Sequence, residues 1–446
     1  MTSSVPRSIL PPLSADEQQH SAAVAARLRE AIGAAGGWLS FEQFMELALY
    51  APGLGYYSAG SAKIGSGGDF VTAPEISDLF SRCVASQCAQ VLSATGGGIL
   101  ELGAGTGRMA GVVLESLAAA GVLPDRYYIL EVSADLAERQ RERLSSLPPS
   151  LRGRVVWLER LPERPFRGVI LANEVLDALP CQRFVVEADD AFENGGLVVH
   201  EPREHESAAR GSAVDELAAH ELVVHQSAGS GSAVHESAAR GSVVHELGVS
   251  LKGDSFIERA AIPDAALAGA LESLLRELPQ PLPSGYTSEV CLKLEPWITS
   301  VGECLERGLI LLFDYGLPRS HYYHPQRVNG TLRCHFKQLA HDNPYINVGV
   351  QDITAWVDFT RVAEAGVAAG LDVTGFCTQA AFLLATGIES LVAGAVGVVE
   401  AARLAGEARR LLMPGEMGEA FKAIALTRDY DAALSGFALQ DLRHSL

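Results

Sequence analysis

The sequence predicts an α/β protein whose mainly parallel sheet is covered by helices on both faces. Short apolar runs with strand character alternate with segments of helical period from residue 99 onward, and a glycine-rich turn at residues 103–107 follows the first run. The chain has 446 residues, of which 48% are hydrophobic and 20% charged. A chain of this length and composition can bury a sizeable core and form two or three domain-sized units.

Seven apolar runs are predicted as the strands of the sheet. Parallel strands that are buried on both faces are typically continuous apolar runs, and segments with helical period lie between most of them. The predicted strands are residues 99–102, 127–132, 155–158, 168–172, 309–314, 371–377 and 421–427. The predicted helices between them are residues 107–120, 133–146, 287–306 and 353–369.

A helical extension is predicted before the sheet. Two capping boxes, each a serine followed three positions later by Glu or Gln, predict helices over residues 14–35 and 40–50. The stretch at 53–75 contains several glycines and Pro74, which we expect to prevent a regular element. This stretch is interpreted either as an ordinary surface loop or as a lid over a site.

The alternation of strands and helices is interrupted in the middle of the chain. A hairpin is predicted over 182–199 and a further strand over 249–260, and a ten-residue repeat occupies about 203–247. Six of the twelve histidines lie in or beside the repeat; metal binding is one interpretation, but a solvated, dispensable, low-complexity insertion is favoured. The predicted units are an N-terminal helical and lid segment, a first part of the sheet domain, an inserted β-rich segment and a second part of the sheet domain: residues 1–80, 81–180, 181–286 and 287–446.

Composition and charge argue against several function classes. Thirty-five basic and 54 acidic residues give a net charge of −19, which argues against a bulk nucleic-acid binder. The seven scattered cysteines include no CxxC pair, so a disulfide framework or cysteine metal site is not expected. No apolar run reaches the roughly 20 residues of a membrane helix, and no signal-peptide pattern is visible. We therefore expect a soluble, cytoplasmic protein that has no metal site and does not insert into membranes.

The glycine-rich turn predicts a cofactor site. Gly103, Gly105 and Gly107 allow a tight turn and a close approach of the backbone to a ligand, as dinucleotide, nucleotide and S-adenosylmethionine sites all require. Glu101 precedes the turn, where its carboxylate would repel a pyrophosphate but hold an amino group. Glu131 ends the next predicted strand, where it can accept hydrogen bonds from two ribose hydroxyls. The pattern favours S-adenosylmethionine, with S-adenosylhomocysteine as the product.

Polar residues follow the fourth predicted strand. In an open α/β sheet a ligand lies beyond the carboxyl ends of the strands, near the point between strands one and four, which puts Asn173, Glu174 and Asp177 beside the methyl donor. Glu174 and Asp177 can hold a guanidinium group by charge-assisted hydrogen bonds; the alternative is that they cap a helix. A DNPY run at 342–345 is similar to a signature of adenine methyltransferases, but we interpret it as coincidental because it lies after strand five and lacks one proline.

These features together resemble the MidA-like family of S-adenosylmethionine-dependent methyltransferases. The resemblance implies a class I methyltransferase fold, Rossmann-like, with a seven-stranded sheet. It implies cofactor binding by Glu101, the three glycines of the turn and Glu131; we also assign Asn173, Gly68, Asp69, Thr72 and Glu75 to the cofactor pocket, the last four as part of a lid. The runs that carry the resemblance are FMELALYAPGLGYYS (44–58), GDFVTAPEISDLF (68–80), LELGAGTGR (100–108), NEVLDALP (173–180), FDYG (313–316), GTLRCHFKQLAHDNPYINVGVQDITAWVDF (330–359) and MGEAFKAIAL (417–426).

The resemblance also implies a reaction. Mitochondrial members of the family are complex I assembly factors that dimethylate an arginine on the quinone-site subunit of NADH dehydrogenase, and this chain resembles a bacterial relative. A protein-arginine N-methyltransferase acting on such a subunit is therefore expected, with Glu174 and Asp177 as the catalytic pair. The family's typical NEFFDALP reads NEVLDALP here, which keeps both acids. Two alternatives stay open: a small-molecule or other amino-group methyltransferase, and a non-catalytic assembly scaffold.

Overall fold

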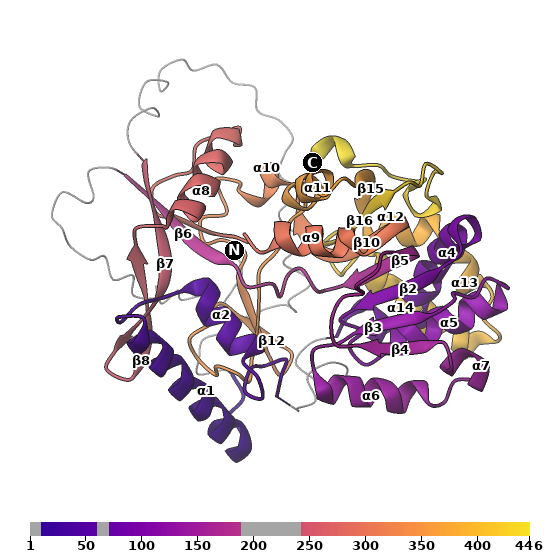
Figure 1. The fold of residues 1–446 in the computed structure, drawn as a ribbon, viewed down its shortest axis with the longest axis horizontal. Helices are drawn as coiled ribbons and strands as arrows, with labels where there is room; N and C mark the ends of the chain where they lie inside the picture. The colour runs from indigo at the N-terminus through magenta and orange to yellow at the C-terminus, as the bar shows by residue number, and fades with distance from the viewer. Residues whose placement is uncertain (1–9, 60–70, 189–241) are drawn as a thin grey trace.

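The computed structural model describes residues 10–59, 71–188 and 242–446. Its larger part is a sheet with helices on both faces, and a smaller β-rich lobe lies at one end of that sheet together with the N-terminal helices (Figure 1). In the described residues, no helix is both long and apolar enough to span a membrane. All seven cysteines are free thiols, and six of them are buried.

The central sheet has the predicted strands. Its main path runs β15-β16-β10-β5-β2-β3-β4, and β16 is antiparallel to both of its neighbours while the other pairs are parallel. This confirms the expected mainly parallel sheet, with the largest differences in strand ends at β10. The strands are β2 (Gly98–Leu102), β3 (Tyr127–Leu130), β4 (Val155–Leu158), β5 (Phe166–Asn173), β10 (Leu305–Leu317), β15 (Asp372–Thr378) and β16 (Phe421–Arg428), and the short β14 (Val357–Asp358) pairs with the end of β10.

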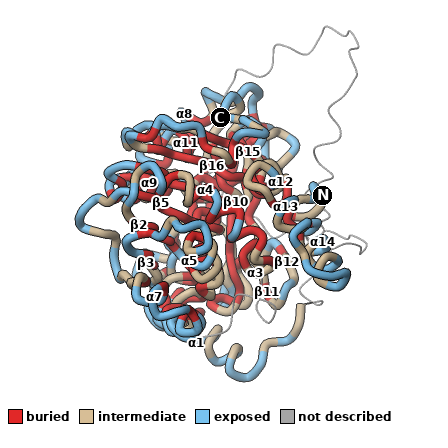
Figure 2. The backbone as a smooth tube through the Cα atoms, turned by 90° about the vertical axis from the view of Figure 1, so that its right-hand side faces the viewer, coloured by how far each residue is buried: buried red, intermediate tan, exposed pale blue. Residues whose placement is uncertain are grey.

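Helices bury both faces of this sheet, and its strands are among the most buried segments of the chain (Figure 2). On one face Phe313 of β10 packs against Phe80 and Phe382, with ring centroids 5.1 and 4.9 Å apart. The other face packs mainly against α9 and α11. The helices are α3 (Ala73–Ile76), α4 (Asp78–Thr95), α5 (Arg108–Ala119), α6 (Ala134–Leu144), α7 (Pro149–Arg152), α9 (Leu294–Glu303), α11 (Phe359–Ala368), α12 (Gln379–Ala385), α13 (Ile388–Ala393) and α14 (Val398–Leu412).

The β-rich lobe combines the predicted insertion with the N-terminal helices. Its main sheet runs β1-β7-β6-β9, with β8 paired to β7, and both predicted capping boxes are present at the starts of α1 and α2. A three-stranded sheet, β12-β11-β13, lies beside it. These elements are α1 (Ala15–Ala34), β1 (Leu39–Ser40), α2 (Phe41–Tyr50), β6 (Gln182–Ala188), β7 (Ser242–Lys252), β8 (Ser255–Ala261), α8 (Ala265–Glu277), β9 (Tyr286–Val290), α10 (Arg319–Tyr322), β11 (Arg333–Phe336), β12 (Leu339–His341) and β13 (Asp352–Thr354).

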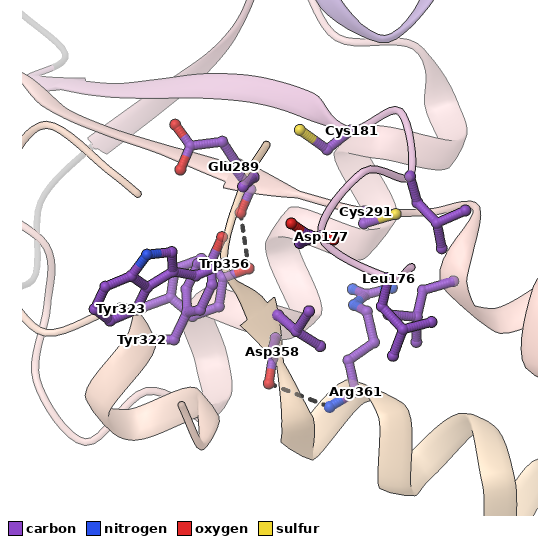
Figure 3. Close-up of a pocket in the computed structure, with 14 residues that line it drawn as sticks. Leu176, Asp177, Cys181, Glu289, Cys291, Tyr322, Tyr323, Trp356, Asp358 and Arg361 are labelled. Atoms are coloured by element: carbon purple, nitrogen blue, oxygen red, sulfur yellow. Dashed lines mark hydrogen bonds between the residues drawn. The ribbon is translucent and has the colours of Figure 1, made fainter. Parts of the chain in front are cut away.

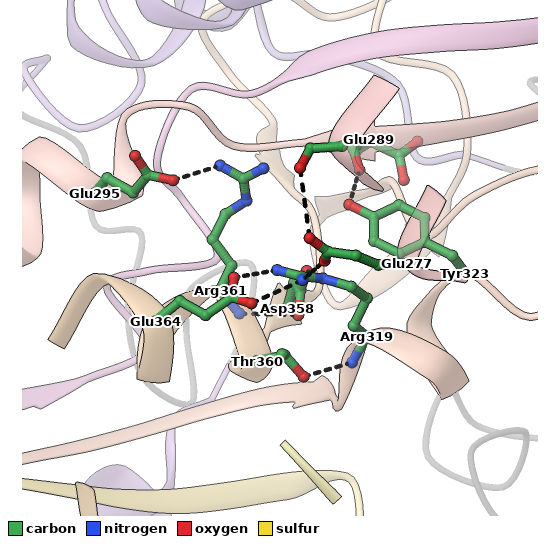
Figure 4. A network of polar contacts seen from close by, with 10 residues as sticks. Glu277, Glu289, Glu295, Arg319, Tyr323, Asp358, Thr360, Arg361 and Glu364 are labelled. Carbon is green, nitrogen blue, oxygen red and sulfur yellow. Dashed lines mark hydrogen bonds and ion pairs between the residues drawn. The ribbon is translucent and has the colours of Figure 1, made fainter. Parts of the chain in front are cut away.

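Ion pairs join the lobe to the sheet domain (Figure 4). The Arg319 guanidinium, only 12% exposed, contacts Glu277 of α8 in the lobe, Asp358 at the end of β14 and Glu364 of α11. Nη1 of Arg319 donates to Oε1 of Glu364 at 2.8 Å. On the same helix, Nη1 of Arg361 donates to Oε1 of Glu295 at 3.0 Å. The network therefore fixes α11 against both parts of the molecule.

Several predicted elements were wrong. The helix predicted over 287–306 begins only at α9, because the preceding residues pair with β6 as strand β9. The helix predicted over 353–369 begins at α11, where the Asp358 side chain caps it by accepting from the Arg361 N–H at 3.2 Å; β13 and β14 precede it. The strand predicted over 249–260 is the β7–β8 hairpin, which turns at Gly253 with φ of +61°.

Other corrections concern the loop and the insertion. Pro74 lies in the first turn of α3, where backbone N–H groups have no hydrogen-bond partner within the helix. Its lack of an N–H group therefore costs no hydrogen bond, and a short helix forms. Helix α4 includes residue 80, where the first predicted unit ends, and the division into units stays a prediction. The partners of β6 are β7 and β9, and the turn predicted near residues 194–196 lies outside the described residues. Most of the repeat also lies outside them, but its last residues belong to β7.

A row of glycines allows the close approach of three neighbouring strands, and we expect Gly168→Ala to destabilise the fold by more than about 1 kcal/mol. Gly168 of β5 has φ of +130°, and a Cβ there would lie 2.0 Å from the Gly98 carbonyl oxygen. The control is Gly269→Ala on α8, where nothing lies within 4 Å; it should be neutral or stabilising by up to about 1 kcal/mol. Urea unfolding measures both, and equal stabilities of the two variants would contradict the prediction.

Candidate active site

The glycine-rich turn connects β2 to α5 at the carboxyl end of the sheet. Gly103, Gly105 and Gly107 have φ of +64°, +53° and +79°, in the left-handed region that other residues rarely adopt. A Cβ at Gly103 would lie 3.1 Å from Val175, and one at Gly107 would lie 3.2 Å from the Gln140 side chain. Because the turn has no side chains at its glycines, a ligand can approach its backbone closely. The same glycines allow it to pack against Val175 and against Gln140 of α6.

The two predicted cofactor-binding acids lie on either side of this turn. Glu101 of β2 is buried, and the Tyr127 hydroxyl donates to its Oε2 at 2.6 Å. Burial raises the pKa of Glu101 to about 7, partly opposed by the hydrogen bond from Tyr127, and the charge of Glu131 adds to the rise. A buried carboxylate of this kind is stabilised by a cationic partner, which fits the amino group of S-adenosylmethionine.

Glu131 is held by a residue that sequence reasoning missed. Its carboxylate accepts from the Ser133 N–H and from Nε2 of Gln140, both at 2.9 Å, and burial raises its pKa. The same Nε2 donates to the Gly105 carbonyl oxygen at 2.9 Å, and Nε1 of Trp157 donates to Oε1 of Gln140 at 3.0 Å. Gln140 is fully buried on the apolar face of α6, and a polar residue at such a position was the available signal.

The predicted lid segment contacts the glycine-rich turn. The Thr106 hydroxyl donates to the Glu75 carboxylate, and Nη1 of Arg108 donates to the Glu75 carbonyl oxygen at 2.5 Å. Thr72 is the N-cap residue of α3, without a side-chain capping hydrogen bond. Glu75 is thus brought beside the cofactor turn, whereas Gly68 and Asp69 lie outside the described residues, and the role of Thr72 stays a prediction.

The acids after β5 lie on a turn, not on a helix. Glu174 has φ of +54°, and its Oε1 accepts from Nδ2 of Asn173 at 3.0 Å and from the Ala73 N–H at 3.4 Å. Because no helix begins at residues 174–178, the alternative that these acids cap a helix is wrong. Among the described residues, Oδ1 of Asn173 and Oδ1 of Asp177 are buried without a hydrogen-bond partner, so each can accept a hydrogen bond from a ligand.

Asp314 holds this turn and was not predicted as a site residue. It lies at the carboxyl end of β10, next to β5, and is fully buried. Its Oδ2 accepts from the N–H groups of Leu176 at 2.9 Å and Asp177 at 3.2 Å, and its Oδ1 accepts from the Tyr315 N–H at 2.9 Å. An acid at the end of the strand beside strand four was a usable signal, because the rule that selected Glu174 applies to it equally.

Tyrosines and a fourth acid complete the site, and sequence reasoning missed these too. The Tyr57 hydroxyl donates to Oδ1 of Asp352 at 2.9 Å, and the Tyr50 hydroxyl donates to the Ala178 carbonyl oxygen at 2.9 Å. The two tyrosine rings stack with centroids 5.5 Å apart. These residues come from α2, the turn after it and β13, so the N-terminal helices form one wall of the site.

The electrostatics of the site are strongly acidic. Burial and the charge of Asp177 raise the pKa of Glu174 to about 8, and burial raises that of Asp177 to about 6. Burial, then the charges of Asp177 and Glu174, raise the pKa of Asp314. Within the described part of the chain, no arginine or lysine forms an ion pair with these three carboxylates.

A small pocket lies on the inner side of the turn (Figure 3). Three acids (Asp177, Glu289 of β9 and Asp358 of β14) and Arg361 line it together with apolar and aromatic side chains. The DNPY run does not take part in this pocket or in the acid group. Its Tyr345 hydroxyl donates to Glu258 of β8 at 2.9 Å, in the β-rich lobe.

The raised pKa of Glu174 predicts how stability depends on pH. Its pKa is about 8 in the folded protein against 4.5 as the ordinary value, so the folded state binds more protons between these values. The free energy of unfolding should therefore fall as pH rises from about 5 to about 8, and the buried Glu101 adds to the same trend. Glu174→Gln should make this fall smaller, whereas Glu138→Gln, on the exposed side of α6, should leave it unchanged. Urea unfolding at several pH values measures the slope; identical slopes in wild type and Glu174→Gln would refute the assignment.

Comparisons with known proteins identify the family of the chain and its cofactor. The family model Methyltransf_28, described as an S-adenosyl-L-methionine-dependent methyltransferase, matches residues 83–377. A COG1565 superfamily member from Burkholderia thailandensis, solved with S-adenosyl-homocysteine bound, is 37% identical with a TM-score of 0.82, covering 98% of this chain and 100% of that one. A native structure of a COG1565 superfamily protein from the same organism is 36% identical with a TM-score of 0.80, at the same coverage.

Curated relatives match over a shorter region. The mitochondrial protein arginine methyltransferase NDUFAF7 of Danio rerio is 30% identical over 175 residues, which is 34% of this chain and 41% of that protein. The Homo sapiens protein of the same name is 29% identical over 174 residues, 33% of this chain and 39% of that protein. The chain thus spans about two-fifths of the length of the curated relatives it matches.

The family match extends from α4 to β15 and includes the glycine-rich turn, the turn after β5 and Asp314. The positive-φ glycines, the buried carboxylate at the end of β2 and the orphaned oxygen of Asn173 all suit S-adenosylmethionine, which is the cofactor. The chain therefore belongs to the Methyltransf_28 family of S-adenosylmethionine-dependent methyltransferases, in agreement with the MidA-like family that its sequence resembles.

Proposed function

We propose that this methyltransferase is a protein-arginine N-methyltransferase in which Glu174 and Asp177 hold the acceptor guanidinium. The observation that carries the proposal is the group of buried carboxylates after β5 that has no cationic partner in the described chain. A guanidinium is a cation with donors in a planar fork, so it satisfies two carboxylates at once. The names of the mitochondrial relatives support the same acceptor.

The cofactor is assigned to the other side of the same edge of the sheet. Glu101 would hold its amino group, Glu131 its ribose hydroxyls, and the bare backbone of the glycine-rich turn would lie along it. We also assign contacts to Asn173, Thr72 and Glu75, and to Gly68 and Asp69 as the preceding part of the lid. Bound S-adenosylmethionine supplies an activated methyl group, so the protein needs chiefly to orient the acceptor and exclude water.

The proposed step places specific demands on the two acids. A protonated guanidinium is a poor nucleophile, and carboxylates on two of its nitrogens draw positive charge away from the third. The methyl group moves from sulfur to nitrogen, so a nitrogen–carbon bond forms as the sulfur–carbon bond breaks. The electron pair of the broken bond stays on sulfur, and the methylated nitrogen loses one proton. The raised pKa values of Glu174 and Asp177 suit a proton acceptor at this point.

The substrate protein is inferred from the resemblance alone. A subunit of respiratory NADH dehydrogenase, the quinone-site subunit in the mitochondrial members, is the candidate. Mass spectrometry of that complex from cells with and without this protein tests it: a methylated arginine present only with the protein supports the candidate, and identical spectra refute it. A cytoplasmic location stays a prediction.

The two alternatives are separated by assays of methyl transfer and cofactor binding. With radioactive S-adenosylmethionine and cell lysate, labelled protein supports the proposal, whereas label only in small molecules favours a small-molecule methyltransferase. A scaffold that lacks catalysis would bind no S-adenosylhomocysteine in calorimetry.

Glu131→Ala should weaken S-adenosylhomocysteine binding by roughly 1–3 kcal/mol, because it removes a charged acceptor from the ribose hydroxyls. Asp135→Ala on the first turn of α6 is the control and should keep wild-type affinity. Calorimetry measures both; an unchanged affinity in Glu131→Ala would rule out the ribose assignment.

Asp177→Asn should lower turnover by roughly 10- to 100-fold, because one charge-assisted hydrogen bond to the guanidinium is worth about 1.5–3 kcal/mol. Affinity for S-adenosylhomocysteine should change by less than about threefold, since Glu101 and Glu131 lie on other strands. Asp254→Asn, on the exposed β7–β8 turn, should retain full activity. Wild-type turnover of Asp177→Asn would exclude a catalytic role for this residue.

A further inference from the structure

Asp314 occupies a position that joins two strands of the sheet through the catalytic turn. Phe313 of β10 lies opposite Asn173 of β5, so the next residue on β10 faces the turn that carries both acids. Its carboxylate accepts three backbone N–H groups, two from that turn and one from its own strand. An amide could not replace it without penalty, because its NH₂ group would face an N–H donor.

Among the described residues, the titratable groups around Asp314 are mainly acids and neutral tyrosines. Tyr315 lies beside it on β10, Glu174 and Asp177 on the turn, Asp352 on β13, and Tyr50 and Tyr57 on the N-terminal wall. Lys422 of β16 lies opposite Asp314 in register, but its ammonium donates to the Glu419 carbonyl oxygen. Arg361 and Asp358 line the pocket on the inner side of the turn (Figure 3).

The unpartnered oxygen of Asp177 indicates where the acceptor would enter. Asp177 is 5% exposed, and among the described residues its Oδ1 has no hydrogen-bond partner. A neutral guest would leave the surrounding carboxylates without a counter-charge in a buried place, whereas a cation would offset them. The acid group therefore selects charge as well as hydrogen-bonding shape.

We propose that Asp314 is a positioning residue for methyl transfer: it holds the turn that carries Glu174 and Asp177, and its buried charge makes the site selective for a cationic acceptor over a neutral one of the same shape. The inference rests on the proposed function and extends it from the two acids that touch the acceptor to the strand that supports them. It also predicts that a proton held by the acid group leaves when the cation enters.

The test compares two acetylated tripeptides, Gly-Arg-Gly and its neutral citrulline analogue, as ligands of the enzyme saturated with S-adenosylhomocysteine. Wild type should bind the arginine peptide at least tenfold more tightly than the citrulline peptide. Affinity for the arginine peptide should rise with pH and level off above about 8, as the acid group loses its proton. Equal affinity for both peptides at every pH would instead contradict the proposed function itself.

Asp314→Asn should lower affinity for the arginine peptide by tenfold or more at pH 9, because one charge is lost beside Glu174 and Asp177 and the amide NH₂ group faces an N–H donor. It should leave the citrulline peptide nearly unaffected. The midpoint of the pH dependence should shift to lower pH, because removing a neighbouring negative charge makes the remaining acids easier to ionise. A merely structural role would not move this midpoint, and unchanged S-adenosylhomocysteine affinity verifies the fold.

Asp352→Asn is the matched variant. Its Oδ1 can still accept from Tyr57 and from the Ile353 N–H, so it removes one charge without touching the turn. It should shift the midpoint to lower pH with a smaller loss of affinity at pH 9 than Asp314→Asn. The proposal is overturned if arginine-peptide affinity in folded Asp314→Asn stays within twofold of wild type, or if the midpoint does not move. Should Asp314→Asn not fold, an unmoved midpoint in Asp352→Asn overturns it.

Discussion

The hydrogen bonds from the N–H groups of Leu176 and Asp177 to the Asp314 carboxylate tie the end of strand β10 to the turn after β5. The turn is also held by the Glu174 N–H, which donates to the Phe313 carbonyl oxygen at 2.9 Å, and by the Ala355 N–H, which donates to the Asp177 carbonyl oxygen at 3.0 Å. The turn carries Glu174 with positive φ, a conformation that is strained for a glutamate and persists only where the surroundings hold it. Because β5 and β10 are paired along their length, the rigid sheet determines where both acids lie.

The cofactor side of the site is organised in a similar way by Gln140. Its side-chain amide contacts the Gly105 carbonyl oxygen, the Glu131 carboxylate and the Trp157 indole, so one buried residue of α6 connects β2, β3 and β4. Buried amides that satisfy several partners at once are effective at fixing geometry, because each bond would be costly to leave unmade. Both halves of the site therefore rely on a buried polar residue that touches no ligand in the assignments made above.

The sheet and the residues at its strand ends could be predicted from the sequence because both follow from local pattern. Apolar runs identify buried parallel strands, and topology alone brings Glu101, Glu131, Asn173, Glu174 and Asp177 to one edge. Gln140 and Asp314 each carry a local signal, a polar residue on an apolar helix face and an acid at a strand end, but these signals do not identify their partners. The contacts of Gln140, Asp314 and Asp352 join segments far apart in the chain, so their roles could not be predicted from local pattern. The same reason explains the failed helix at 287–306: its first residues pair with β6, and periodicity carries no information about a distant partner.

Under the proposed function, the buried acids are a cost in stability that is offset when a cationic acceptor binds. Removing several carboxylates from water without a counter-ion disfavours the folded state, and a sequence selected for stability alone would place apolar or paired residues there. Here the raised pKa values of Glu174, Asp177 and Asp314 record that cost in the empty protein. Under the proposed function, a cationic acceptor would offset this cost on binding, and a neutral one would not. The destabilisation of the empty site and the proposed preference for a guanidinium would then have one physical origin, the group of buried acids around the turn after β5 that has no cationic partner among the described residues.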